Sequence, residues 1–225
     1  MSETPSERDA AAPPAVAIRP AELSAYIAAR MCHDFISPAS AIISGLDLLE
    51  DPSAQDMQAE AMGLINASAR KLADLLSFTR VAFGASASAE TFDARELEKL
   101  ARGVFSHMRA ELDWAVEPAA VNKPAARALL NLAQLGGAAL PTGGTARVRA
   151  VQEGASLALA VEATGPRARL RPEVLAGLQG AALGEGLHGH WAQAYYVHLF
   201  VTDAGGRVFA DVTEEQVTFA ATIPA

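Results

Sequence analysis

The sequence predicts an α+β fold, with an N-terminal helical hairpin followed by a two-layer α/β sandwich. Two observations carry this prediction. In residues 1–83, two long segments repeat apolar residues at every third or fourth position, which is the period of an amphipathic helix. In the second half, short segments of alternating polar and apolar residues come in adjacent pairs, with helical segments between the pairs. This order favours one sheet with helices covering a single face.

The first 20 residues are small, polar and proline-rich, so we expect residues 1–20 to form a disordered tail. The tail has neither a basic flank nor a long apolar run, and we therefore expect no signal peptide. No other segment reaches the roughly 18 to 20 apolar residues of a membrane span. The single cysteine, Cys32, permits no internal disulfide and suits a reducing compartment. We expect a cytoplasmic protein.

A helical hairpin is expected over residues 21–83. The first helix covers residues 21–50, and the proline and serine in the segment "EDPS" favour a break and a restart. The second helix covers residues 54–83. Two long helices joined by a tight break form an antiparallel pair.

Each helix of the hairpin carries an apolar stripe. The stripes comprise Leu23, Ile27, Met31, Pro38, Ala41, Gly45 and Leu48 on the first helix, and Met57, Ala61, Leu64, Ser68, Leu72, Leu75 and Thr79 on the second. A single hairpin leaves part of each stripe in water, which pairing with a second copy into a four-helix bundle would cover. We therefore expect a homodimer. The alternative is that the hairpin packs onto the C-terminal half of its own chain.

Residues 84–91 have the composition of a linker, and residues 92–225 are expected to form a second domain. The patterns predict helices over residues 94–109, 123–139, 172–178 and 193–203, and strands over residues 112–116, 146–151, 156–162, 207–212 and 216–223. The strands at 146–151 and 156–162 are expected to form a hairpin. The glycine pair at 205–206 is a helix stop.

The net charge of −8 argues against nucleic acid and anionic membranes as partners, because both select basic surfaces. Hydrophobic residues make up 51% of the chain, which is ample for a core. The composition therefore favours other proteins as partners.

The segment "RMCHDFISPASAII" at residues 30–43 places a proline inside the first helix, close to a His-Asp pair. A proline in a helix interior costs roughly 3 kcal/mol or more and frees a backbone carbonyl one turn before it. For Pro38 that carbonyl lies beside His33, and a functional histidine would justify the cost.

His33 is expected to face solvent. Helical spacing places it on a face of mostly small residues: Ile36, Ser37, Ser40 and Ser44. A solvent-facing imidazole keeps a nitrogen lone pair free near neutral pH, as a nucleophile toward a phosphoryl group requires. Asp34 points about 100° around the helix. From there it can hydrogen-bond a ring nitrogen within its own turn or across the bundle.

The segment "HDFISPASAI" resembles the phosphoacceptor box of sensor histidine kinases, in which a histidine, an acidic residue and a proline recur in this order. His33, Asp34 and Pro38 match. Ser37 stands where those kinases usually have threonine or asparagine, a departure that bears on any phosphatase activity. The resemblance implies that residues 21–83 are a dimerisation and histidine-phosphotransfer hairpin.

The second domain resembles the ATP-binding domain of those kinases in its order of elements, but its nucleotide contacts are missing. Asn131 matches the first asparagine of the paired-asparagine helix, while Leu135 replaces the second, whose oxygen would hold Mg²⁺. Near the turn glycine Gly165, Ala163 replaces the aspartate that reads adenine, and Arg167 replaces the second glycine. We expect an ATPase-like shape that binds no ATP.

A phosphoacceptor hairpin followed by a degenerate ATPase-like domain resembles the ChpT-type histidine phosphotransferases of bacterial phosphorelays. The resemblance covers nearly the whole chain after the tail. It implies that His33 takes a phosphoryl group from the receiver aspartate of a hybrid kinase and passes it to a response regulator. No cofactor of the chain's own is expected, because the receiver domain would bring Mg²⁺.

The catalytic pair is therefore His33 and Asp34. Candidates for receiver docking are Ile36, Ser37, Ser40, Ile43 and Ser44 around the histidine, with Arg70 and Lys71 on the second helix. An equally good interpretation is that Ile36 and Ile43 complete the core of the helical bundle. His188 and His190, in a glycine-rich loop, are interpreted as incidental.

Two other functions remain open. One is an ATP-dependent histidine kinase with unorthodox nucleotide contacts, and the other is a dimeric scaffold that binds receivers without exchanging phosphate.

Overall fold

The computed structural model describes residues 18–84, 89–183 and 188–225. It begins with two long antiparallel helices, α1 (Pro20–Glu50) and α2 (Gln58–Ala82), joined through a 3₁₀ turn at Gln55–Met57. The helices approach closely at Gly45, where a Cβ atom would lie 2.6 Å from Cγ1 of Ile65. Glycine is therefore needed where the two helices cross.

The second domain contains four helices and seven strands in the described residues. The helices are α3 (Ala94–Phe105), α4 (Lys123–Ala138), α5 (Pro172–Leu178) and α6 (His188–Asp203). The strands are β1 (Thr91–Asp93), β2 (Ala110–Val116), β3 (Ala120–Asn122), β4 (Gly144–Glu153), β5 (Ser156–Thr164), β6 (Arg207–Val212) and β7 (Gln216–Pro224).

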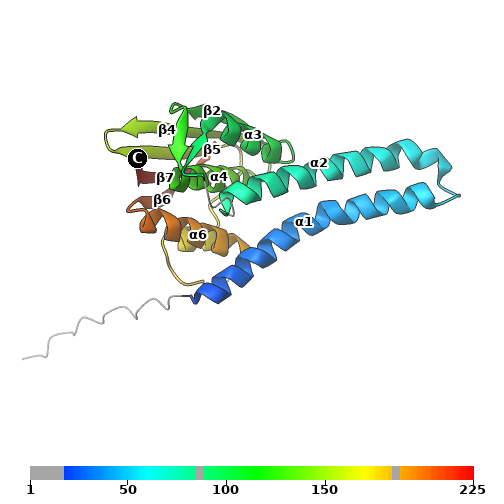
Figure 1. Ribbon diagram of the computed structural model, residues 1–225, viewed down its shortest axis with the longest axis horizontal. Coiled ribbons are helices and arrows are strands. Elements are labelled where there is room, and N and C mark those ends of the chain that lie inside the picture. Colours follow the sequence, from blue (N-terminus) through cyan, green and yellow to red (C-terminus); the bar gives the residue numbers. More distant parts are fainter. Residues whose placement is uncertain (1–17, 85–88, 184–187) are drawn as a thin grey trace, which may run out of the picture.

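Five of the strands form one sheet in the order β2-β4-β5-β7-β6. The β2–β4 pair is parallel and the other neighbours are antiparallel. On β4, Ala146, Val148 and Ala150 are buried while Arg147 and Arg149 are exposed, so only one face of the sheet enters the core. Helices α4 and α6 lie against that face (Figure 1). The expected two-layer sandwich is therefore confirmed.

Helix α4 is the centre of the core, because nearly all of its side chains are buried, including Leu129, Leu130 and Leu132. Its N-terminus is capped by Asn122, whose side chain accepts a hydrogen bond from the Ala125 amide at 3.0 Å.

Both helices of the hairpin are attached to the second domain. On α2, Leu75, Phe78, Val81 and Ala82 join the main core beside α3 and α4. On α1, Leu23 packs in a separate cluster with residues of α6, including Trp191. The domain thus covers the base of the hairpin, and the hairpin tip projects away from it (Figure 1). At its base, the hairpin therefore packs onto the C-terminal half of its own chain, which was the alternative to pairing with a second copy.

Several expected boundaries were wrong. The tail cannot extend to residue 20, because Ile18 packs against the cluster around Leu23 and α1 begins at Pro20; residues 1–17 lie outside the described part. The linker cannot include Thr91, which begins β1, and residues 85–88 of that linker also lie outside the described part. Helix α3 ends at Phe105 rather than residue 109, because strand β2 already begins at Ala110.

No helix in the described residues is long and apolar enough to cross a membrane.

Candidate functional site

His33 lies on the side of α1 that borders the second domain, and its side chain is 86% exposed. The ring is oriented from within its own turn, because Nδ1 lies 3.3 Å from Oδ1 of Asp34. With the ring proton on Nδ1, Asp34 accepts it and the lone pair remains on Nε2. The solvent-facing placement and the contact within one turn both agree with expectation.

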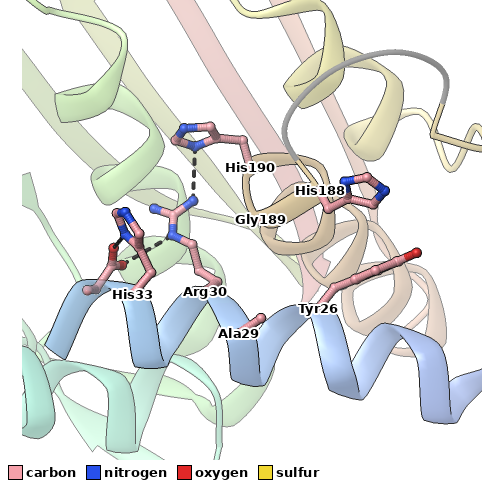
Figure 2. A pocket seen from close by; sticks show the side chains of 8 residues that line it. Tyr26, Ala29, Arg30, His33, His188, Gly189 and His190 are labelled. Atoms are coloured by element: carbon pink, nitrogen blue, oxygen red, sulfur yellow. Dashed lines mark hydrogen bonds and ion pairs between the residues drawn. The ribbon is translucent and has the colours of Figure 1, made fainter. Parts of the chain in front are cut away.

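Asp34 is shared between two partners. Its other oxygen, Oδ2, accepts a hydrogen bond from Nε of Arg30 at 3.2 Å, one turn earlier on α1. Nη1 of the same guanidinium lies 2.9 Å from Nδ1 of His190, in the first turn of α6. Figure 2 shows these side chains as a continuous chain from α1 to α6. His188 and His190 lie in the first turn of α6 rather than in a loop, and His190 connects that helix to Arg30.

The charge state of His190 follows from its partner. A guanidinium nitrogen only donates, so Nδ1 of His190 accepts and the ring is neutral with its proton on Nε2. Burial lowers the pKa of His190, and the positive charges of Arg30 and Arg171 lower it further, against the opposing effect of Glu173 and Asp34.

We expect this lowered pKa to make folding stability depend on pH. Below the usual His190 pKa of 6.5, the unfolded chain gains a proton at this ring while the folded chain does not. The free energy of unfolding should therefore fall as the pH drops from 6.5 toward the lowered native pKa of His190. Well above pH 6.5 the ring is neutral in both the folded and the unfolded chain, so His190 should cause no loss of stability there. Urea titrations at about pH 5 and about pH 7.5 check this against His190→Asn, which does not titrate. An equal loss of stability between these two pH values in the wild type and in His190→Asn would contradict this prediction.

Two hollows flank His33. The first, of about 280 Å³, lies toward α6 and is lined by Tyr26, Ala29, Arg30, His33, Asp34 and residues 188–190. Its outer wall is formed by the rings of Tyr26 and His188, whose centroids are 4.8 Å apart. The second, of about 310 Å³, lies toward α2, α3 and α4, with Lys71, His107 and Gln134 among its lining residues. His33 can thus be approached from either side.

The expected docking residues fall into two groups. Around His33, all five are exposed: Ile36, Ser37, Ser40, Ile43 and Ser44. Within one chain the isoleucines therefore do not complete a core. On α2, Arg70 is exposed, whereas Lys71 is half-buried and lines the second hollow with His33.

The residues at the nucleotide positions are used for packing. Asn131 is fully buried, and its Nδ2 donates to the carbonyl oxygens of Ala82 and Arg127 at 2.8 and 3.0 Å. Its Oδ1 accepts from Nε2 of Gln193 at 3.2 Å. The amide thus ties the end of α2 to α4 and α6. Leu135 is buried in the core.

Sequence reasoning missed Arg30 and His190. The Arg30–Asp34 pair has the spacing of neighbours on a helix, which is a signal visible in the sequence. The contact between Arg30 and His190 joins residues 160 positions apart, and nothing local indicates it.

Comparisons with known proteins agree on one family. The family described as "Histidine phosphotransferase C-terminal domain" matches residues 94–216. Protein phosphotransferase ChpT of Brucella abortus (strain 2308) is 34% identical over 201 residues, which is 89% of this chain and 95% of that protein. A solved structure of a bacterial phosphotransferase is 32% identical with a TM-score of 0.81, covering 92% of this chain and 98% of that one.

Proposed function

Since this chain belongs to the histidine phosphotransferase family and acts in a phosphorelay, we propose that His33 is the residue that carries the phosphoryl group. It accepts the group from the receiver aspartate of a hybrid histidine kinase and passes it to the receiver aspartate of a response regulator. The observation that carries this assignment is the exposed imidazole, with Nδ1 directed at Asp34 and Nε2 without a hydrogen-bond partner among the residues that the structure describes.

The transfer needs positioning more than covalent machinery. Asp34 holds the Nδ1 proton, so the Nε2 lone pair points outward to the incoming phosphorus. As the N–P bond forms, the P–O bond to the receiver aspartate breaks and the electron pair leaves with that carboxylate. Mg²⁺ supplied by the receiver domain neutralises charge on the phosphoryl oxygens. Transfer to the regulator is the same exchange in reverse.

We also propose that ATP is not the source of the phosphoryl group. In support, Asn131 has both ends of its amide engaged by the protein. Leu135 and Ala163 are buried and carry no side-chain oxygen for a metal ion or adenine. These residues do not fit a nucleotide with Mg²⁺.

We propose that the protein is a homodimer joined through the outer face of the hairpin. This face carries apolar residues at the spacing of helical bundles: Ala39, Ile42 and Leu46 on α1, and Met62, Ala69, Leu72 and Leu76 on α2. All seven are exposed or half-buried in the single chain. The α2 residues that enter the domain core, such as Phe78 and Val81, lie on another side of the helix.

Receivers would dock on the side of α1 around His33. Ile36 and Ile43 are exposed and large enough to act as apolar anchors, and the small side chains of Ser37, Ser40 and Ser44 beside them leave room for close approach. Arg70 and Lys71 on α2 offer positive charge to acidic receiver residues.

Incubation with several phosphorylated receiver domains tests this function. We expect phosphate to appear on this chain in an acid-labile, alkali-stable form, as a histidyl phosphate requires, and to move on to a second receiver. Millimolar ATP with Mg²⁺ alone should give none. Labelling by ATP alone would instead identify a kinase, and receiver binding without any transfer would identify a scaffold.

A further inference from the structure

We propose that His190 and Arg30 are positioning residues for the phosphoacceptor, so that the second domain controls the orientation and ring tautomer of His33. This inference rests on the proposed role of His33. It gives helix α6 a specific role in the transfer, and the sequence alone indicated no role for that helix.

The contacts form an unbroken series from one domain to the other. His33 Nδ1 meets Asp34 Oδ1 at 3.3 Å, Asp34 Oδ2 meets Arg30 Nε at 3.2 Å, and Arg30 Nη1 meets His190 Nδ1 at 2.9 Å. Each side chain therefore restrains the next.

Arg30 is held more firmly than an arginine on an ordinary helix surface. Its side chain is only 15% exposed, against 30% for Asp34. Its aliphatic stem packs on the α6 backbone, since a Cβ atom on Gly189 would lie 3.1 Å from Cδ of Arg30. Exposed ion pairs contribute little because water screens them and both side chains are mobile. Here both the aliphatic stem and the guanidinium of Arg30 are restrained, so the Arg30–Asp34 pair can hold the Asp34 carboxylate in one orientation.

The planar guanidinium makes the two contacts interdependent. Nε and Nη1 diverge at a fixed angle, so an acceptor at His190 directs Nε toward Asp34. Without that acceptor the guanidinium is free to rotate or to leave Asp34. The His33 ring then loses the fixed partner that selects its tautomer.

The same link fixes the arrangement of charge beside His33. Arg30 pairs with the Asp34 carboxylate at 3.2 Å, so the charge next to the imidazole ring keeps one position. Other ionisable groups around the two hollows are Lys71, His107, His188 and Tyr26, and Arg171 and Glu173 act on His190 from the start of α5. Breaking the link should therefore slow the transfer without weakening receiver binding.

A matched pair of variants at position 190 separates this role from simple packing. His190→Phe keeps the ring volume but removes the acceptor, whereas His190→Asn keeps an acceptor atom attached to Cγ and loses the ring. Arg30→Met retains a stem against Gly189 and leaves α6 unchanged. If His190 acts through Arg30, His190→Phe should have no further effect in the Arg30→Met background.

The experiment measures phosphoryl uptake from a phosphorylated receiver by the full chain between about pH 5.5 and pH 8.5, with receiver affinity measured separately. We expect His190→Phe and Arg30→Met each to slow uptake about three- to tenfold near pH 6.5, the scale of one lost charge-assisted hydrogen bond. Receiver affinity should be unchanged, and His190→Asn should transfer like wild type.

The inference is overturned if Arg30→Met keeps the wild-type rate, or if His190→Phe slows the reaction equally in the Arg30→Met background. It is also overturned if His190→Asn is as impaired as His190→Phe. Wild-type uptake in the same assay keeps this result separate from the proposed function, because failure of that function would leave the wild type unlabelled.

Discussion

Replacing His33 with glutamine should reduce phosphoryl uptake from a phosphorylated receiver by roughly a thousandfold or more, since the nucleophile itself is removed. The glutamine amide nitrogen has no available lone pair, so no N–P bond can form at that position. The folded state should be almost unaffected, because the His33 side chain is 86% exposed and its ring hydrogen bond within the described residues is to the neighbouring Asp34. Quantification of alkali-stable phosphate on the chain measures the loss, and urea titration measures the stability.

His198→Asn is the matched control for that experiment. It also removes an imidazole, but the ring of His198 makes a structural contact with the carbonyl oxygen of Leu178 at 2.9 Å. Asparagine can present a donor at the same position, so we expect normal uptake. Undiminished transfer by His33→Gln would show that another residue carries the phosphate. Receiver binding by His33→Gln without transfer is the expected result, and a wild type that also only binds would indicate a scaffold.

The hairpin and the sandwich could be predicted because their signals are local. Proline and serine after Glu50 end α1 where expected, and the strand β6 occupies the predicted residues 207–212. Strands β1 and β3 were missed because three residues are too few for an alternating pattern. The start of α6 was placed five residues late, because Gly189 lowers helix propensity in its first turn.

The candidate site could be predicted only in part, for a similar reason. His33 and Asp34 are neighbours, and Pro38 lies one turn after Asp34 on α1, so the sequence carries their relationship. His190 on helix α6 lies 160 positions from Arg30 in the sequence, and the folding of the second domain brings the two side chains together. The partner of Arg30 therefore depends on tertiary packing, which a pattern of neighbouring residues does not contain.

The apolar stripes show how a correct period can be assigned to the wrong contact. Periodicity placed Leu23, Pro38 and Gly45 on one face of α1 and assigned that face to a dimer. In the structure Leu23 packs on α6, and Pro38 and Gly45 are buried inside the chain. A second stripe, ending in Leu46 on α1 and Leu76 on α2, remains uncovered. The proposed dimer therefore rests on this second face.

Introducing charge on the outer face should separate the dimer. Leu46 and Leu76 are 46% and 50% exposed in the single chain, so glutamate is tolerated there in a monomer. In a bundle the same carboxylates would be buried without partners, at a cost of several kcal/mol each. We expect Leu46→Glu combined with Leu76→Glu to raise the dimer dissociation constant by roughly a thousandfold or more. Light scattering should change from two 23.4 kDa chains to one.

Phe209→Glu provides the matched control, because Phe209 is a large apolar side chain that is 57% exposed but lies on the edge strand β6. If dimerisation depended on exposed apolar area in general, this substitution would also dissociate the protein. Because the bundle spacing is found on the hairpin, we expect the Phe209 variant to remain dimeric. A wild type that scatters as one chain at micromolar concentration, or a dimer that survives both glutamates, would show that the outer face is not the interface.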